Sequence, residues 1–435
     1  MKQLITGVLL VAALILSGAV TAQTGQADDR SQQGPGQGDA RPSDPEDAPI
    51  SRLLAAPVYL WEGLTYPVKK FTIFVERVDL IERGLDFFLN DERTGGVLPR
   101  FSIGGAIDTG IGFTAFEENL FDQGKQGRLS YGFAVRGNAI AEASYIDPAL
   151  FGSRFRFETE LEWLDADEGR FWPGGNNANE NDRTQFALSQ FSGTVGLSRP
   201  FFGDLSASFF TRYFAGSGEQ SDRGEATIPL ATPGVGPNVQ AVELETGVRY
   251  DTRDNPFAPV SGWLLDTTLT YTEQVNGHEF RYSGYSFQVQ RYIPVFRDNR
   301  ILLLRGRVSR RNGSHGQSIP FYELNVLDVN RDLRGYERGR WRDRGAIVFN
   351  VEWRYQVWEA FSGSLFYDTG RVFTHYDELE DGDFQHAVGF GFRFATRRQF
   401  TFRAQVAYGD EGAEVLLKGD LEFERKRGPQ VGGSQ

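Results

Sequence analysis

Three residues late in the chain carry complementary charges at a regular spacing. Arg334 lies in a loop rich in arginine, glycine and aromatic residues, and Glu352 and Asp368 lie in the two strand-like segments that follow. A guanidinium pairs with carboxylates through parallel hydrogen bonds, which fix its orientation as well as supply energy. We therefore predict that this loop folds back onto the two strands, whose acidic side chains point inward.

The residues after the arginine suit a locked loop. Gly335 permits a tight backbone turn, and Tyr336 completes an arginine–glycine–aromatic triplet. An unpaired Arg334 in a partly dry interior would be costly, so we expect the loop to hold one position. The triplet alone is a weak signal, but two acidic strands at this spacing make it more specific. The predicted lock comprises Arg334, Gly335, Tyr336, Glu352 and Asp368.

The strand around Glu352 indicates what kind of interior the loop enters. Apolar side chains occupy every second position from Ile347 to Tyr355, with Asn350, Glu352 and Arg354 between them. Successive side chains of a strand point to opposite faces, so the polar set shares one face. In a membrane barrel the apolar face meets lipid and the polar face lines the lumen.

The same alternation recurs from residue 100 to near the end of the chain. Aromatic residues stand near the strand ends, and the strands reach the ~9–11 residues of a tilted membrane strand, which favours a membrane barrel over a soluble sandwich. Long connections at 166–184, 216–240 and 311–345 alternate with short turns, as they do between the two sides of an outer-membrane barrel. We predict an all-β fold, a transmembrane antiparallel β-barrel of about 16 strands with a short helical N-terminal extension. The strands are expected near 101–107, 110–119, 127–137, 139–148, 153–165, 185–199, 205–215, 241–251, 262–273, 282–294, 300–310, 346–356, 362–373, 385–394, 399–408 and 413–423.

The start of the chain predicts export. Lys2 precedes a short apolar run, and Val20-Thr21-Ala22 gives small residues before a cleavage point, which is typical of a signal peptide. The next stretch is polar and rich in proline and glycine, so it cannot bury enough surface to fold. The predicted parts are a signal peptide at 1–22, a disordered leader at 23–49, a short helical extension or plug at 50–99, the barrel at 100–423 and a tail at 424–435.

The composition excludes several classes of site and partner. The chain contains no cysteine, which excludes disulfides and thiolate metal sites. Its formal net charge of -12 argues against a nucleic-acid partner. We expect outer-membrane lipid around a monomeric barrel, and a periplasmic or outer-membrane protein partner that binds through 50–96.

Side chains suited to catalysis or to a metal ion are few. The four histidines are scattered and show no metal-ligand spacing. No Gly-x-Ser-x-Gly elbow occurs, although His315 leaves a phospholipase open as a weak alternative. The acidic stretch 165–183 lacks the ordered spacing of a calcium loop. We expect no enzymatic activity, no catalytic residue, no cofactor and no metal site. The histidines are His278, His315, His375 and His386.

The loop and the two acidic strands resemble the BamA/TamA-type barrels of the bacterial surface-antigen superfamily, which are outer-membrane assembly and translocation proteins. In that family an arginine–glycine–aromatic motif folds from the long sixth extracellular loop into the lumen, where acidic residues of the next two strands hold the arginine. Arg334-Gly335-Tyr336 matches this motif, and Glu352 and Asp368 occupy the matching acidic positions. The resemblance implies a protein of the bacterial outer membrane.

A second stretch, 250–262, resembles the Asp-Thr-Arg-Asp-Asn-Pro turn that the family carries between two central strands. Acidic, amide and proline residues in close succession favour a tight connection, so we predict a periplasmic turn with a structural role. The segments 389–394 and 414–423 also resemble the family's closing strands. The turn motif comprises Asp251, Arg253, Asp254, Asn255, Pro256, Pro259 and Gly262.

The chain departs from the family at both ends. POTRA modules usually precede the barrel, and 50–99 is too short for one, while a tail follows Phe423, where the family usually ends. The resemblance implies a barrel that aids insertion or export of proteins or lipids by opening between its first and last strands, where Ser102, Gly104 and Gly105 give little side-chain packing. The alternative is a passive pore or structural barrel whose lumen the inward-folded loop constricts.

Overall fold

The computed structural model of this protein describes residues 88–90, 92, 94–103, 109–134, 137–222, 226–236, 238–256, 258–295, 297–358, 361–395 and 400–421. The expected signal peptide, leader, tail and most of the helical extension lie outside these residues. All described residues belong to one compact unit, Leu85–Gln435. No helix in this part of the chain is long and apolar enough to cross a membrane.

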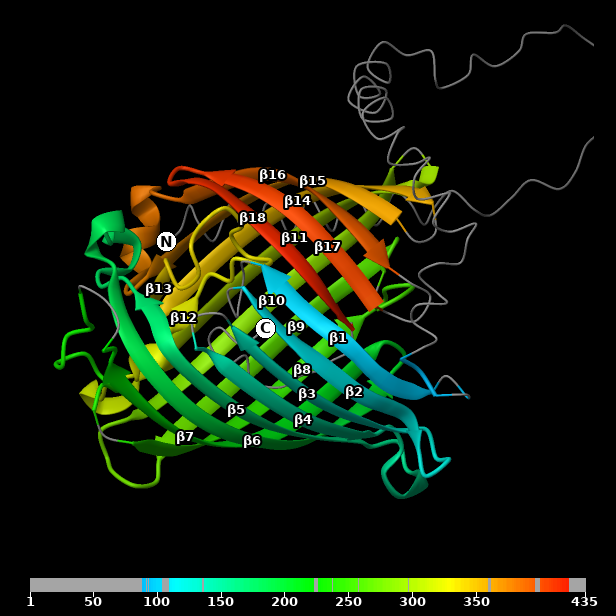
Figure 1. The fold of residues 1–435 in the computed structure, drawn as a ribbon, viewed down its shortest axis with the longest axis horizontal. Coiled ribbons are helices and arrows are strands. Elements are labelled where there is room, and N and C mark those ends of the chain that lie inside the picture. The colour runs from blue at the N-terminus through cyan, green and yellow to red at the C-terminus, as the bar shows by residue number, and fades with distance from the viewer. Residues whose placement is uncertain are drawn as a thin grey trace, which may run out of the picture. The chain divides into compact units, whose positions relative to one another are not determined.

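Sixteen antiparallel strands close into a barrel (Figure 1). Each barrel strand pairs with the barrel strands before and after it in sequence, and the first strand also pairs with the last. The prediction of an all-β antiparallel barrel is therefore confirmed, with the even number of strands that closure requires. One more pair of short strands, β12 and β13, lies in the connection between β11 and β14.

The elements of the described residues have the following bounds. The barrel strands are β1 (Gly95–Ile103), β2 (Gly110–Leu120), β3 (Lys125–Ala134), β4 (Ala139–Asp147), β5 (Arg156–Phe171), β6 (Thr184–Phe202), β7 (Leu205–Gln220), β8 (Val239–Asp251), β9 (Gly262–Gln274), β10 (Arg281–Val295), β11 (Arg297–Gly313), β14 (Gly345–Trp358), β15 (Phe361–Phe373), β16 (Gln385–Ala395), β17 (Phe400–Gly409) and β18 (Gly412–Leu421). The short pair is β12 (Asn325–Val326) and β13 (Arg342–Asp343). Short 3-10 turns are η2 (Leu150–Gly152), η3 (Gly175–Asn177), η4 (Glu180–Asp182), η5 (Ser314–Gly316), η6 (Phe321–Glu323) and η7 (Tyr376–Asp381).

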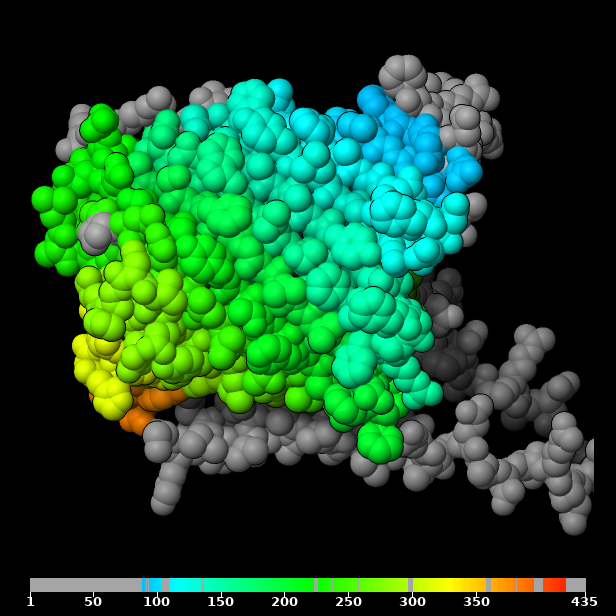
Figure 2. Space-filling model, turned by 90° about the horizontal axis from the view of Figure 1, so that it is seen from below, coloured from blue at the N-terminus to red at the C-terminus, as the bar shows by residue number. Residues whose placement is uncertain are grey.

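The barrel wall is apolar outside and polar inside. On β5, Leu161 and Trp163 are 50% and 39% exposed, whereas Glu162 between them is 6% exposed. On β14, Phe349 is exposed and its neighbour Asn350 is buried. Exposed apolar and buried polar side chains reverse the order of a soluble core and fit a wall that faces lipid. Figure 2 shows the strands from β1 to β8, coloured blue to green, covering one side of the barrel as a continuous surface.

Several strands are longer or placed differently than predicted. β5 continues to Phe171, so the first part of the expected loop 166–184 is strand, and β7 continues to Gln220. β1 begins at Gly95, before the expected start at 101. The extension of β5 has a physical reason, because Phe171 packs in an apolar cluster with Phe321 from the connection between β11 and β14. Alternation within a strand does not report such contacts with a distant loop.

Candidate functional site

The connection between β11 and β14, residues 314–344, packs inside the barrel, and we call it the lumen loop. Its residues Leu333, Tyr336 and Trp341 are buried in one apolar cluster with Val348 of β14. Counted from β1, it is the sixth connection at the end of the barrel that carries the long loops. The loop therefore contacts the inner wall through apolar side chains as well as through the charges described next.

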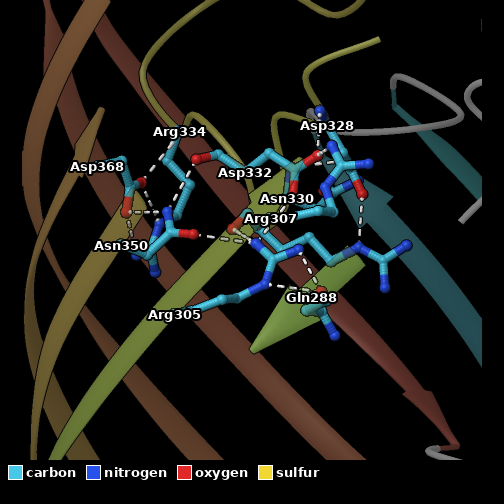
Figure 3. A network of polar contacts seen from close by, with 10 residues as sticks. Gln288, Arg305, Arg307, Asp328, Asn330, Asp332, Arg334, Asn350 and Asp368 are labelled. Atoms are coloured by element: carbon cyan, nitrogen blue, oxygen red, sulfur yellow. Dashed lines mark hydrogen bonds and ion pairs between the residues drawn. The ribbon is translucent and has the colours of Figure 1, made fainter. Parts of the chain in front are cut away.

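Arg334 of the lumen loop connects two neighbouring strands. Its Nε and Nη2 atoms donate to the two carboxylate oxygens of Asp368 on β15, each at 2.7 Å (Figure 3). Its Nη1 donates to Glu352 on β14 at 2.8 Å, and its guanidinium carbon lies 3.4 Å from the centre of the Phe366 ring. Asp368 is 0% exposed and Arg334 is 6% exposed. The bidentate pair holds the guanidinium in one orientation in a site that water barely reaches.

The surroundings of this pair keep both charges compensated. Burial by itself lowers the pKa of Arg334, but the hydrogen bonds and charge of Asp368, together with Glu352, raise that pKa above its ordinary value. Asp368 also accepts from the backbone N–H of Arg334 at 3.2 Å and from the amide of Asn350 at 2.8 Å. Buried ions are tolerated when they are paired and hydrogen-bonded in this way.

A second ionic cluster, which the sequence did not lead us to expect, lies beside the first. Asp332 of the lumen loop pairs with Arg305 at 2.9 Å and with Arg307, both on β11. Burial raises the pKa of Asp332, but the charges of Arg307 and Arg305 outweigh it and lower that pKa to about 2. Asn350 connects the two clusters, because its amide nitrogen donates to the Asp332 carbonyl and to Asp368, each at 2.8 Å (Figure 3). Its side-chain oxygen accepts from Arg305 at 3.0 Å.

Gly335 and Tyr336 hold the lumen loop against β16 and β17. Gly335 has a φ of +91°, which favours glycine, and a Cβ there would lie 3.1 Å from the backbone nitrogen of Gly409. The Tyr336 hydroxyl donates to the carbonyl of His386 at 2.9 Å. The structure thus brings the residues of the expected lock, from Arg334 to Asp368, into one continuous site.

Another part of the lumen loop is held on a different side of the wall. Glu323 accepts from Arg212 of β7 at 2.5 Å and from Arg311 of β11 at 2.6 Å. Glu243 of β8 pairs with the same two arginines, at 3.5 and 3.8 Å. Burial raises the pKa of Glu323, but the charges of Arg212 and Arg311 outweigh it and lower that pKa. The side chains of Arg212, Glu243 and Glu323 are 0–1% exposed, so this is a buried ionic cluster.

Arg340 ties the returning part of the lumen loop to the last hairpin of the barrel. Its Nε and Nη2 atoms lie 2.8 and 2.7 Å from a carboxylate oxygen of Glu411, in the turn between β17 and β18. The guanidinium carbon lies 3.9 Å from the centre of the Trp341 ring, a cation–π distance. Charged residues of the lumen loop therefore reach several parts of the wall: Glu323, Asp332, Arg334, Glu337 and Arg340.

Part of this missed network left a signal in the sequence. Arg305, Arg307 and Arg311 lie two and four residues apart on β11 and so share its lumen face. Three cations on one inward face predict acidic partners in the lumen, and the sequence alone permits this prediction. Glu323 and Asp332, in contrast, lie in a loop without periodicity, so no spacing assigns them to those arginines.

The expected turn motif forms the connection between β8 and β9. Arg253 donates to both carboxylate oxygens of Asp251, at 2.8 and 2.7 Å, and to the carbonyl of Pro256 at 3.2 Å. Asp254 accepts from the backbone N–H groups of 260 and 261, at 2.9 and 3.0 Å. Gly262 has a φ of +108°. The remaining two residues are Asn255, which accepts from the N–H of Ala258 at 3.2 Å, and Pro259, which is buried.

Neither the histidines nor the acidic residues give a catalytic or metal assignment. His386 stacks on Tyr367, with its Nδ1 2.7 Å from the tyrosine hydroxyl. Among the described residues, no histidine belongs to a group of three potential metal ligands. One group of carboxylates does gather, with oxygens within 4.8 Å of one another, and Arg100 lies 2.9 Å from its first member. Acidic groups alone do not define a metal site. The members are Glu142, Glu160 and Glu162.

The comparison with known families agrees with this geometry. Residues 119–413 match the family model of the Omp85 superfamily domain, which is more than half of the chain. The chain belongs to the Omp85 superfamily. The expected membership in this class of barrels is thereby confirmed, and this Omp85 barrel resides in the bacterial outer membrane.

Solved structures of three proteins share the fold of this Omp85 barrel. BamA from Haemophilus ducreyi lacking POTRA domains 1-3 has a TM-score of 0.54 and 12% identity over 75% of this chain and 70% of that chain. CdiB from Acinetobacter baumannii has a TM-score of 0.50 and 12% identity over 75% of this chain and 59% of that chain. CdiB from Escherichia coli has a TM-score of 0.50 and 12% identity over 75% of this chain and 63% of that chain. This chain thus spans less than two thirds of either CdiB. No curated protein matches the chain in sequence.

Proposed function

We propose that this Omp85 barrel aids the insertion or export of proteins or lipids at the outer membrane by opening sideways between β1 and β18. The pairing of that seam is the observation that supports the proposal. Within the described residues, β1 pairs with β18 at three positions, from Phe101–Gly419 to Ile103–Leu417, whereas it pairs with β2 at eight. Each backbone hydrogen bond contributes about 0.5–1.5 kcal/mol, so a short ladder separates at lower cost than a long one.

Aromatic packing supplements the backbone pairing at the seam. Gly419 of β18 has no side chain, and the Phe101 ring occupies the space where its Cβ would be. The Phe101 ring also lies 6.1 Å from the ring of Phe402 on β17. Aromatic packing therefore contributes to the closed seam beside a short described ladder.

The absence of cysteine from the chain permits a direct test. Ile103→Cys combined with Leu417→Cys places two thiols at directly paired positions across the seam, near the spacing that a disulfide requires. In cells that depend on this protein, oxidation should lower the levels of other outer-membrane proteins or lipids, because the seam can no longer open. Addition of a reductant should restore those levels.

A matched pair of cysteines serves as the control. Leu365→Cys with Phe390→Cys joins β15 and β16, which are directly paired at these positions and stay together in the proposed opening. The oxidised control should leave outer-membrane composition normal. If both disulfides act alike, the seam is not the gate. If depletion of the whole protein leaves outer-membrane proteins and lipids unchanged, the assembly or export role is wrong.

A passive pore is the second candidate, and the cavity beneath the lumen loop favours it. The cavity has a volume of about 650 Å³ and is lined mainly by polar and charged side chains. The lumen loop would then limit ion flow. Conductance in planar bilayers should rise when 314–344 are deleted, while the levels of other outer-membrane proteins stay constant in cells that lack this barrel.

We further propose that a periplasmic or outer-membrane protein partner contacts the segment 50–96. Its apolar spacing supports this role, since short amphipathic segments suit binding to another protein. Site-specific photo-crosslinkers placed in this segment should capture the same partner from several positions. Capture that is equally efficient from the exposed position Phe202, the last residue of β6, would contradict a specific contact.

A further inference from the structure

Three arginines face away from the lumen near one end of the barrel. They lie on β6, β10 and β11, and on the last two strands they alternate with residues that line the central cavity, such as Gln290 and Leu303. On β6, the outward residues Val195 and Leu197 are 46% and 38% exposed, and the arginine takes the next outward position. We call these three residues the rim arginines: Arg199, Arg291 and Arg300.

The rim arginines lie at the end of the barrel opposite to the lumen loop. Arg199 precedes the short turn between β6 and β7, and Arg291 and Arg300 flank the connection between β10 and β11. The lumen loop follows β11, and the strands are antiparallel, so the loop lies at the other end. The short turns of an outer-membrane barrel face the periplasm. The rim arginines therefore lie at the periplasmic edge of the lipid-facing wall, where the lipid headgroups begin.

Each rim arginine lies over an aromatic ring. Two of these rings belong to the residue that is directly paired with the arginine on the neighbouring strand, Trp263 with Arg291 and Tyr355 with Arg300. A ring attracts the face of a guanidinium and leaves the N–H donors along its edge for other groups. From the guanidinium carbon to the ring centre, the distances are 5.1 Å for Arg199 on Phe155, 4.7 Å for Arg291 on Trp263 and 5.6 Å for Arg300 on Tyr355.

The charges of the rim arginines are not compensated within the part of the chain that the structure describes. None of the three makes an ion pair with a carboxylate there. Arginines inside the barrel differ, since Arg354 lies 2.7 Å from Glu352 and Arg307 pairs with Asp332. A cation beside an apolar, lipid-facing surface is costly unless an anion accompanies it. The position of the rim arginines thus favours an anion from outside the protein.

We propose that the rim arginines bind the phosphate groups of phospholipids in the periplasmic leaflet of the outer membrane. A guanidinium fork pairs bidentately with phosphate, and the ring beneath it fixes its orientation. The acyl chains of the same lipid would lie along the apolar outward residues of the strand, such as Leu197. The proposal does not depend on whether the barrel opens at its seam or conducts ions.

The spread of the rim arginines favours lipids over one soluble ligand. β6 and β10 are separated by three strands, and neighbouring strands lie ~4.8 Å apart, so Arg199 is ~19 Å along the wall from the strand of Arg291. A small anion cannot span that distance, whereas separate lipids around the barrel can occupy both positions. Arg199 also lines a cavity of about 580 Å³ beside the turn between β6 and β7, which leaves room for a headgroup.

Phosphatidylglycerol is the probe, added to the full-length protein in an uncharged detergent without phosphate. We expect it to raise the midpoint of thermal unfolding in a saturable way. Diacylglycerol with the same acyl chains lacks the phosphate and should raise the midpoint less. Replacement of all three rim arginines by glutamine should increase the concentration of phosphatidylglycerol needed for half of the response roughly 10–100-fold, because charged hydrogen bonds to phosphate are lost.

A matched control removes the same number of charges elsewhere. Arg183→Gln, Arg331→Gln and Arg344→Gln change three exposed arginines of connecting loops, none of which lies on the outer face of a barrel strand. This variant should respond to phosphatidylglycerol as the wild type does. Lysine at the three rim positions keeps the charge without the fork, so that variant should retain part of the response.

Unfolding without lipid separates binding from folding. The rim arginines have no acid to lose, so their glutamine variant in detergent alone should unfold close to the midpoint of the wild type. A clearly lower midpoint without lipid would assign the rim arginines a role within the protein instead. Inorganic phosphate that stabilised the protein as phosphatidylglycerol does would assign a soluble anion and overturn the lipid. Equal lipid responses of the rim and control variants would show that the rim arginines are not a phosphate site.

Discussion

Replacement of Arg334 by alanine tests how strongly the lumen loop is held. The change removes two hydrogen bonds to Asp368 and one to Glu352. Glu352 keeps Arg354 at 2.7 Å, so it stays paired. Asp368 is 0% exposed and keeps the Asn350 amide and a backbone N–H as donors, but it loses its cation. Removing one partner of a buried ion pair costs about 3–5 kcal/mol of the free energy of unfolding.

A control for this prediction lies three residues earlier in the same loop. Arg331 is also an arginine paired with an acid, Asp328, at 3.0 Å, but its side chain is 43% exposed. Exposed pairs contribute about 0.2–1 kcal/mol, because water screens the charges. Arg331→Ala therefore repeats the same chemical change where the structure predicts little effect.

The assay is a urea titration of each variant in lipid vesicles, followed by the heat-modifiable migration of the folded barrel. Protease cleavage within 314–344 reports release of the lumen loop separately. Arg334→Ala should lower the free energy of unfolding by several times the effect of Arg331→Ala and expose the loop. Arg334→Glu should be worse, and Glu352→Arg should partly restore it. Equal effects of the two alanine variants would refute the reasoning.

Three further perturbations follow from the same contacts. Glu323→Ala leaves Arg212 buried beside one acid and should cost about 3–5 kcal/mol in the urea titration, and a cost below about 1 would contradict a structural ion cluster. The pKa of Asp332 falls from 3.8 to about 2 on folding, so its contribution is complete above about pH 5 and is lost as the pH falls through 2. Asp332→Asn should flatten the pH dependence of unfolding in that range, and an unchanged slope would count against the pairing. Gly335→Ala should cost about 1–3 kcal/mol through strain and contact with β17, more than Gly382→Ala, which has a positive φ but open space around it.

The number and order of strands could be predicted because apolar and polar side chains alternate along each strand, one set facing lipid and the other facing the lumen. Leu161, Glu162 and Trp163 alternate in the sequence and also in exposure. The ends of the strands could not be read in the same way. Phe171 continues β5 because it packs with Phe321, and no local pattern links residues that far apart. The position at which a strand ends at the rim of a barrel depends on the loop side chains that pack against it there.

The candidate site divides along a similar line. Glu352 and Asp368 were accessible to prediction because each lies at an inward position of an alternating strand, directly after the loop that carries Arg334. Glu323 was not, since its partner Arg212 lies 111 residues away on β7. The contacts of a loop that crosses the lumen depend on which wall residues the closed barrel brings near it. Periodicity predicts which wall residues face inward, but it does not predict where a loop residue meets them.

The lumen loop holds one end of the last hairpin, and this bears on how the proposed seam would open. Gly335 lies against β17 at Gly409, and Arg340 pairs with Glu411 in the turn between β17 and β18. The described seam pairs of β18, at 417–419, lie toward its opposite end. Opening at the turn end would also require release of an ion pair whose arginine is 3% exposed, which adds to the cost of separating the ladder there. Opening would therefore begin at the end of β18 far from the turn, and the turn would act as the hinge. The lumen loop would thus determine which end of the seam separates first.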